Sequence, residues 1–282
     1  MNKPSIIAVL TDFGLSDAYV GTMKGIVLSL CPTARIVDLT HDIRPQNVKQ
    51  AAYVLLTAYR FFPPGTVFLV VVDPGVGTQR KPIAVQTDRG LFVAPDNGVL
   101  SYVLSVVELQ AAVVLDNSDY HLPDVSATFH GRDLFSPVAA HLANGMRLES
   151  LGSALDQLKH LPEPLLEVAL PDIRGEVLHT DHFGNIITSI GHLRWIGADR
   201  LQLIPEFGPD QAACYELDAA ACRVTVGSHT LHRIRTTYGA VPVQRLTSLV
   251  GSSGQLEIGM NRGKAARTLA VSIGDSITLH TG

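Results

Sequence analysis

The chain has 282 residues, 46% of them hydrophobic and 17% charged, and a formal net charge of -4 at pH 7. This composition is sufficient for one large domain or two smaller ones, and it argues against a disordered chain. The negative charge, the absence of a basic run and the 6% aromatic content argue against nucleic-acid binding, and the apolar runs are too short to span a membrane.

Two features of the sequence bear on the compartment. Residues 1–11 contain one lysine and a short apolar stretch without a small-residue cleavage pattern, so we expect the start of a first strand there and not a signal peptide. The three cysteines, Cys31, Cys214 and Cys222, are odd in number and lack metal-type spacing, which fits a reducing compartment. The sequence therefore predicts a cytoplasmic protein.

The first half of the chain alternates between strand-like and helix-like patterns. Three short apolar runs are typical of buried strands: residues 6–10, 35–39 and 66–72. Apolar residues recur at helical spacing in three stretches: residues 19–30, 47–60 and 134–143. Residues 82–86 and 91–94 are expected to form a hairpin, and a turn at 95–98 to lead into a further helix. This alternation predicts βαβ units and a largely parallel sheet.

The second half of the chain has a different pattern. Residues 160–171 are rich in proline and have no helical period, which indicates a linker. Short strands broken by Gly, Asp and Pro are then expected at residues 175–178, 186–190, 200–204, 222–226, 229–234, 246–250, 255–258 and 276–279. This spacing predicts a small all-β sandwich or barrel. We expect domains at 1–160 and 174–282, joined by a linker at 161–173.

Polar residues follow the expected strands of the first domain. Asp73 begins an Asp-Pro-Gly turn after the third strand, with Arg80 a few residues later, and Asp12 follows the first strand. His130 lies on a loop at the entrance of a helix. Ligands of open α/β sheets bind beyond the carboxyl ends of the strands, so these residues are candidates for a site. The alternative is that Asp73 only caps a turn.

Two polar turns occur in the second domain, at residues 179–185 and 252–257. Asn185 can offer a hydrogen-bond donor and an acceptor to the edge of a heterocycle, and Phe183 offers a stacking face. Each of these stretches alone is more often a plain turn than a site.

Six stretches, taken together, resemble one family: residues 11–14, 73–77, 95–98, 129–133, 181–185 and 252–254. The chain resembles the S-adenosyl-L-methionine (SAM) hydroxide adenosyltransferases, which are related to the fluorinase and chlorinase enzymes. The likeness runs in order from Ile6 to about Asn261. It implies a Rossmann-like N-terminal domain with a mainly parallel sheet, a smaller C-terminal β-barrel domain, and a homotrimer whose sites lie between subunits.

The resemblance also implies roles for residues that bind the substrate. Asp12 matches the acid that holds the ribose hydroxyls, and Asp17 and Asp181 match positions near the ammonium of the methionine portion. Phe183 and Asn185 fall where the family contacts adenosine, and Ser252 in the turn facing the methionine end. The further implied substrate-binding residues are Glu257 and Met260, the latter through its backbone. Gln46 lies where the halogenating relatives have a tryptophan, and it is given no role.

The catalytic positions distinguish the branches of the family. Asp73 and Val76 stand where the halogenating enzymes carry tyrosine and threonine, and His130 and Gly131 where they carry tyrosine and serine. The Asp73, Arg80 and His130 set matches the hydroxide-transferring branch instead. The resemblance thus implies in-line attack of water on ribose C5′ of SAM or of its (R)-sulfonium epimer, giving adenosine and L-methionine without a cofactor or metal. Either His130 or Asp73 could accept the proton, while Arg80 stays protonated and should hold Asp73 by a bidentate contact.

Two other functions are compatible with the same residues. A non-catalytic adenosine or nucleoside-binding module would bind the product without forming it. A metal-dependent hydrolase would use some of the 11 histidines, but no His-x-x-x-His or similar spacing occurs. We expect His41, His121 and His179 to be surface or turn residues.

Overall fold

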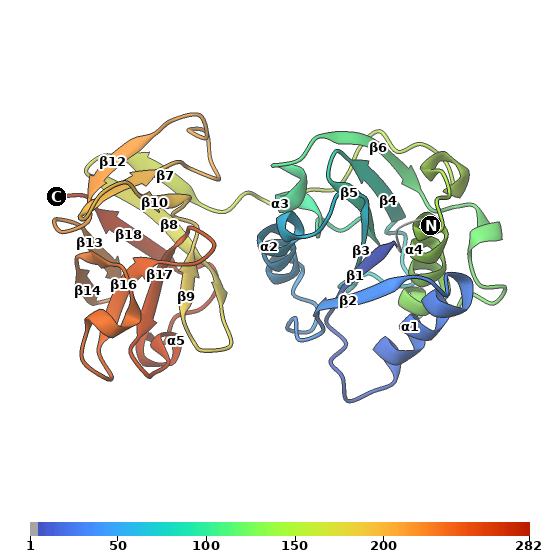
Figure 1. The fold of residues 1–282 in the computed structure, drawn as a ribbon, viewed down its shortest axis with the longest axis horizontal. Helices are drawn as coiled ribbons and strands as arrows, with labels where there is room; N and C mark the ends of the chain where they lie inside the picture. Colours follow the sequence, from blue (N-terminus) through green and yellow to red (C-terminus); the bar gives the residue numbers. More distant parts are fainter. Residues whose placement is uncertain (1–4) are drawn as a thin grey trace. The chain divides into compact units, whose positions relative to one another are not determined.

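The computed structural model describes residues 5–282, so the first four residues of the expected segment 1–11 lie outside it. The chain divides into two compact units, Met1–Leu161 and Pro162–Gly282 (Figure 1). Each unit contains its own sheet. Over residues 5–282, none of the helices has the length and apolar character needed to cross a membrane.

The N-terminal unit is built on a six-stranded sheet with the order β2-β1-β3-β5-β4-β6. Its strands are β1 (Ile6–Thr11), β2 (Arg35–Thr40), β3 (Thr66–Val71), β4 (Pro82–Thr87), β5 (Gly90–Pro95) and β6 (Leu109–Val114). The pairs β1–β2, β1–β3 and β3–β5 are parallel, whereas β4 is antiparallel to both of its neighbours. The expected mainly parallel α/β sheet is confirmed, and β6 is an additional strand.

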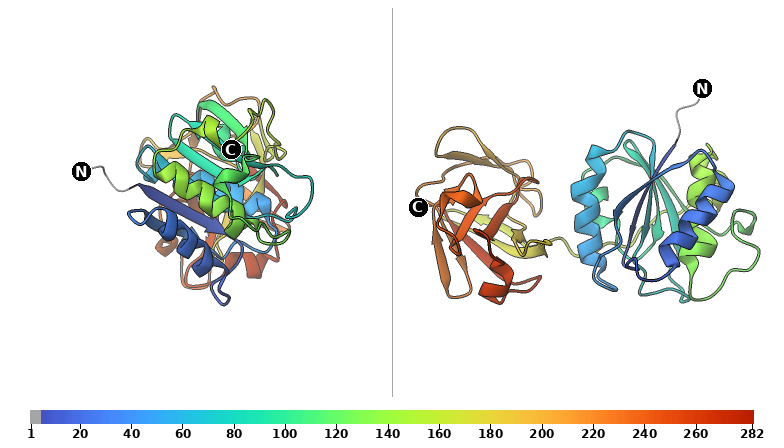
Figure 2. Two further views of the ribbon diagram at one scale, coloured as in Figure 1. Left: turned by 90° about the vertical axis from the view of Figure 1, so that its right-hand side faces the viewer. Right: turned by 60° about the horizontal axis from the view of Figure 1, so that its bottom comes forward.

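Helices cover both faces of this sheet (Figure 2). The helices are α1 (Tyr19–Leu30), α2 (Val48–Ala58), α3 (Ser101–Leu104) and α4 (Ser136–Ala143). Alternate residues of β1 point to opposite faces: Ile7 and Val9 pack with α1 and α4, and Ala8 and Leu10 pack with α2 and α3. This alternation gives the sheet two separate hydrophobic cores, as expected for a sheet buried on both faces.

Local signals in the sequence set the helix ends. Asn47 caps α2, because its side-chain oxygen accepts a hydrogen bond from the backbone N–H of Gln50 over 2.9 Å. The helix α1 ends at Leu30, next to Cys31 and Pro32. The helix expected to begin at residue 134 is preceded by a π-helical turn, Gly131–Phe135, which continues into α4. This turn begins directly after His130.

The C-terminal unit is all-β apart from the short helix α5 (Ala265–Leu269) and a 3-10 turn at Tyr238–Ala240. Its nine-stranded sheet is nearly closed into a barrel with the order β14-β13-β18-β8-β9-β17-β16-β15, and β7 pairs with β8. These strands are β7 (Leu166–Ala169), β8 (Asp172–Thr180), β9 (Ile186–Thr188), β13 (Arg223–Val226), β14 (His229–His232), β15 (Ile234–Arg235), β16 (Leu246–Val250), β17 (Leu256–Met260) and β18 (Ser276–His280). A second sheet comprises β10 (Leu193–Trp195), β11 (Arg200–Leu203) and β12 (Tyr215–Asp218). The expected β-barrel is confirmed.

Candidate functional site

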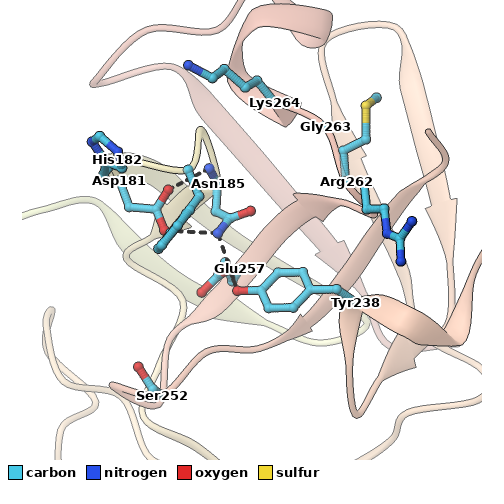
Figure 3. A pocket seen from close by; sticks show the side chains of 11 residues that line it. Asp181, His182, Asn185, Tyr238, Ser252, Glu257, Arg262, Gly263 and Lys264 are labelled. Carbon is cyan, nitrogen blue, oxygen red and sulfur yellow. Dashed lines mark hydrogen bonds between the residues drawn. The ribbon is translucent and has the colours of Figure 1, made fainter. Parts of the chain in front are cut away.

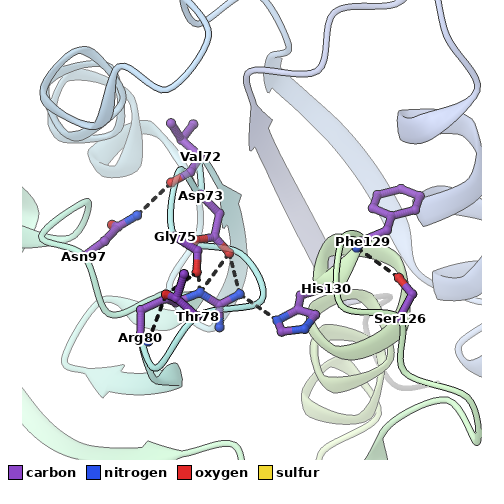
Figure 4. A network of polar contacts seen from close by, with 9 residues as sticks. All are labelled: Val72, Asp73, Gly75, Thr78, Arg80, Asn97, Ser126, Phe129 and His130. Carbon is purple, nitrogen blue, oxygen red and sulfur yellow. Dashed lines mark hydrogen bonds and ion pairs between the residues drawn. The ribbon is translucent and has the colours of Figure 1, made fainter.

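Asp73 and Arg80 form a buried ion pair at the carboxyl end of β3 (Figure 4). Arg80 Nε donates to both carboxylate oxygens of Asp73, over 3.0 Å to Oδ1 and 2.9 Å to Oδ2, and Arg80 Nη2 also donates to Oδ2. Their side chains are only 6% and 5% exposed. The turn between them is closed by a hydrogen bond from the Val76 N–H to the Asp73 carbonyl. The bidentate contact expected from the sequence is therefore present within a single turn.

His130 joins this pair from a distant segment of the chain. Its Nδ1 lies 2.7 Å from Arg80 Nη2. Since a guanidinium group can only donate hydrogen bonds, Nδ1 must be the acceptor, and the neutral ring carries its hydrogen on Nε2. Burial lowers the pKa of His130, and the positive charge of Arg80 lowers it further against the opposing charges of Asp73 and Asp133. The arrangement therefore favours a neutral imidazole of one defined tautomer.

The turn carrying Arg80 packs tightly against the segment that leads to His130. Gly77 has a φ of +74°, and a Cβ atom at this position would lie 2.4 Å from the Ala127 carbonyl oxygen. Only glycine fits both the left-handed backbone and this close approach. On the other side of the turn, the Asn97 amide donates to the Val72 carbonyl over 2.8 Å. The turn that carries Asp73 and Arg80 is thus held on two sides, by the Ala127 backbone and by the Asn97 side chain.

Asp12 follows the neighbouring parallel strand β1, so it and Asp73 both lie beyond the carboxyl ends of paired strands. Asp12 Oδ2 accepts a hydrogen bond over 2.7 Å from the backbone N–H of Gln46, which adopts a φ of +67°. The family resemblance assigns no role to Gln46, but its backbone contacts a candidate site residue. Asp17 lies farther along the same loop and is exposed.

A cavity of about 760 Å³ in the C-terminal unit collects the other candidate residues (Figure 3). Six of the residues that line it were candidates from the sequence: Asp181, Phe183, Asn185, Ser252, Glu257 and Met260. Five others were not: His182, Tyr238, Arg262, Gly263 and Lys264. Phe183 is 71% exposed, so its ring face is available for stacking.

Hydrogen bonds inside this cavity fix the amide of Asn185. Its Nδ2 donates to Asp181 Oδ2 over 2.9 Å and to the Tyr238 hydroxyl over 3.3 Å. The backbone N–H of Asn185 also donates to Asp181 Oδ1, over 2.8 Å. Both amide hydrogens are thus used within the protein, and only the carbonyl oxygen remains for a ligand. The expected contact of Asn185 with adenosine stays a prediction, with the carbonyl oxygen as the atom that could make it.

Tyr238 connects Asn185 to Glu257. Because its hydroxyl oxygen accepts from Asn185, the hydroxyl hydrogen is donated to Glu257 Oε1. The pKa of Glu257 lies above its ordinary value. Burial is the main cause and the negative charge of Asp181 adds to it, while the hydrogen bond from Tyr238 opposes both. Burial and Glu257 together raise the pKa of Tyr238. The three side chains and Asp181 form one connected polar network.

A signal for Tyr238 was present in the sequence. Gly259 lies inside strand β17, and a Cβ atom there would lie 2.6 Å from the Tyr238 ring. A glycine inside a strand often marks the close approach of another group. The turn containing Tyr238 has no strand or helix pattern of its own, so the residue was not predicted.

The structure also bears on the expected histidines. His41 lies in the turn after β2, as one of the two expected positions, and its side chain is buried there, with 4% exposed. Its ring nitrogens face Thr11 and Asp38. No cluster of three or more His, Cys, Asp or Glu side chains suited to a metal ion occurs within residues 5–282.

Comparison with known proteins connects both units to one family. The sequence models of the SAM hydroxide adenosyltransferase N-terminal and C-terminal domains match residues 7–152 and 175–278. The chain is 38% identical to an (R)-S-adenosyl-L-methionine hydrolase of Salinispora tropica, over 98% of both chains. It is 32% identical to a fluorinase of Actinopolyspora mzabensis, over 66% of this chain and 71% of that protein. A conserved protein from Thermotoga maritima has a similar crystal structure, with a TM-score of 0.85, 37% identity and coverage of 97% of this chain and 99% of that one.

Proposed function

The chain belongs to the SAM hydroxide adenosyltransferase family, and we propose on that basis that it is an (R)-S-adenosyl-L-methionine hydrolase. In this reaction the oxygen of a water molecule bonds to ribose C5′ while the C5′–S bond breaks. The electron pair of that bond passes to sulfur, so methionine leaves as a neutral thioether and needs no general acid. The water loses one proton, and the products are adenosine and L-methionine.

The observation that carries this proposal is the contact of Arg80 with both Asp73 and His130. The neutral His130 has its Nδ1 occupied by Arg80, so the ring can accept a proton there only by losing that hydrogen bond. Asp73 Oδ1 accepts a single hydrogen bond from Arg80, whereas Oδ2 accepts two. We therefore propose that Asp73 Oδ1 receives the proton and that the Nε2–H of His130 orients the water.

A carboxylate paired with arginine is a weak base, but this reaction does not need a strong one. Water becomes strongly acidic as its oxygen bonds to carbon, so a weak acceptor is sufficient at that stage. The sulfonium charge disappears as the C5′–S bond breaks, and a partly buried site with little water favours such a loss of charge. The main contribution of Asp73, Arg80 and His130 is then to hold the attacking oxygen in line.

The binding residues follow from the same proposal. Asp12 would hold the ribose hydroxyls, and the cavity of the C-terminal unit would hold the rest of the nucleoside and part of methionine. Asp181 and the exposed Asp17 would attract the ammonium group. Phe183 would stack on adenine, and the Asn185 carbonyl oxygen would accept a hydrogen bond from the adenine amine. Ser252, Glu257 and the backbone at Met260 complete the proposed lining.

We also propose a homotrimer in which each site combines the Asp73, Arg80 and His130 set of one copy with the cavity of another copy. Two exposed apolar side chains support association of copies: Leu15, on the loop after Asp12, is 70% exposed, and Tyr19, the first residue of α1, is 48% exposed. Mixing Asp73→Asn with Asn185→Leu tests this arrangement, because each inactive variant would supply the half that the other lacks. Recovery of activity on mixing supports shared sites, whereas no recovery in stable mixed oligomers contradicts them.

A cytoplasmic location is part of the proposal, because Cys31, Cys214 and Cys222 are all unpaired.

The decisive experiment incubates the purified protein with the separated (R) and (S) sulfonium epimers of SAM, in the presence of a strong chelator and without halide. We expect adenosine and methionine in equal amounts, mainly from the (R) epimer, and none from Asp73→Asn. Adenosine binding without product formation would favour the non-catalytic nucleoside-binding module. Loss of activity on chelation would instead favour a metal-dependent hydrolase.

A further inference from the structure

His41 is a buried histidine outside the Asp73, Arg80 and His130 set, and it links three elements of the N-terminal unit. Its Nδ1 lies 2.9 Å from Thr11 Oγ1 at the end of β1, and its Nε2 lies 3.1 Å from Asp38 Oδ1 on β2. The second oxygen of Asp38 accepts a hydrogen bond over 2.7 Å from Lys24 Nζ on α1. Thr11 is fully buried, so its contact with His41 is shielded from solvent.

The direction of these contacts can be assigned from their chemistry. The contact of Nε2 with Asp38 is electrostatic, and a carboxylate attracts a hydrogen and not a ring lone pair, so the ring hydrogen of His41 belongs on Nε2. Nδ1 is then the acceptor, and the Thr11 hydroxyl donates to it. Thr11 Oγ1 in turn lies 3.3 Å from the Phe13 backbone N–H, from which it accepts. A chain of donors thus runs from the loop after β1 through Thr11 to His41.

His41 holds the same loop a second time through its backbone. The Gly14 N–H donates to the His41 carbonyl oxygen over 2.8 Å. The loop is therefore attached to His41 at Thr11 and at Gly14, on both sides of Asp12. The Asp12 carboxylate has a further anchor, since its Oδ2 accepts from the Gln46 N–H. The direction in which Asp12 points depends on these three attachments.

We infer that His41 is a positioning residue, which sets the Asp12 carboxylate for the ribose hydroxyls without touching the substrate. This inference rests on the proposed function, because that proposal assigns the ribose to Asp12. A residue that acts in this way affects binding only when the ligand carries the hydroxyls. A residue that merely stabilises the fold would affect all nucleosides alike.

The experiment compares the dissociation constants of adenosine and 2′,3′-dideoxyadenosine by calorimetry, using the full chain. His41→Leu removes the acceptor for Thr11, whereas His41→Asn keeps an amide oxygen close to the former position of Nδ1. We expect His41→Leu to weaken adenosine binding about tenfold, because a displaced Asp12 carboxylate would lose a charge-assisted hydrogen bond to a ribose hydroxyl. Binding of dideoxyadenosine should change less than about twofold, and His41→Asn should restore most of the adenosine affinity. In an Asp12→Ala background, His41→Leu should have no further effect.

Two results would overturn the inference: an equal loss for both nucleosides, or no loss for adenosine. If His41→Leu does not fold, Thr11→Val removes the same hydrogen bond with a side chain of the same shape, and it should give the same selective loss. The proposed function is judged separately by product formation in the wild type. If the wild type forms no adenosine from SAM and yet shows the selective effect, the positioning role stands and the hydrolase proposal fails.

Discussion

Arg80 Nη2 lies 2.7 Å from His130 Nδ1, while Arg80 Nε donates to both oxygens of Asp73. One guanidinium group thus connects an acid in its own turn with an imidazole fifty residues later in the chain. The contact determines the tautomer of His130 and contributes a positive charge beside it. The first two predictions depend on this relationship.

In the pH profile of kcat, the midpoint of the fall in activity on the acid side should lie below pH 6.5. Burial and then the charge of Arg80 lower the pKa of His130 from its ordinary value of 6.5, so the neutral ring persists to lower pH. Because the folded-state pKa lies below the unfolded one, the free energy of unfolding should also decline as the pH falls through 6.5 and level off below the folded-state pKa. NMR titration of the imidazole signals, assigned with His130→Gln, measures the pKa directly. A midpoint of this fall in kcat at or above pH 6.5 would contradict the lowered pKa of His130 beside Arg80.

Arg80→Lys should lower kcat about 100-fold or more, because an ammonium group cannot bridge both Asp73 oxygens and His130 at once. Asp73→Asn should cause a loss of similar size while it preserves the shape of the side chain. Adenosine binding should change little in either variant. Steady-state kinetics and calorimetry measure these effects. The matched control is Arg147→Lys. The Arg147 side chain is 83% exposed, so this substitution should leave kcat and adenosine binding unchanged.

Gly77→Ala should reduce both stability and activity. The left-handed backbone and the clash with the Ala127 carbonyl oxygen should together cost about 1–3 kcal/mol of unfolding free energy, and they should displace the segment that leads to His130. Gly65→Ala is the control, since Gly65 also has a positive φ, of +84°, but open space around it. Urea unfolding should detect a smaller loss in Gly65→Ala, and kcat should be unchanged there. Equal kcat values in the two variants would show that the contact is not needed.

Tyr238→Phe should raise KM about three- to tenfold and leave kcat within about twofold. The change removes the hydroxyl that connects Asn185 with Glu257, so the amide loses one of its two anchors, while Asp73 is untouched. Tyr215→Phe, on β12 and outside the cavity lining, is the control. A fall in kcat at constant KM would assign Tyr238 to the chemical step instead.

The parts of the fold that follow from local signals could be predicted from the sequence. The helix α1 was expected at residues 19–30 and spans Tyr19–Leu30, since apolar spacing and the following proline define both of its ends. In contrast, β6 has two alanines and a largely exposed first half, and β10 has only three residues. Such strands are stabilised by pairing with their neighbours, which the sequence of the strand itself does not reveal.

The same distinction applies to the site. The Asp73 and Arg80 contact lies within one turn and could be predicted from the residues alone. The position of His130 beside them depends on how α4 packs against the sheet, and only the family resemblance indicated it. Tyr238 and the buried state of His41 depend on tertiary contacts as well, so single-sequence patterns missed both.

The alternation of side chains along β1 and β3 has a consequence for evolvability. All residues proposed for chemistry in the N-terminal unit stand beyond the strand ends, whereas the residues that β1 and β3 contribute to the two cores stand within the strands. A substitution at Val76 therefore changes the turn after β3, and one at Gly131 changes the start of the π-helical turn; neither replaces a residue of β1 or β3. The fold thus keeps the residues that build the sheet apart from those proposed for chemistry, and the relatives that are similar to this chain carry the names of two different enzymes, a hydrolase and a fluorinase.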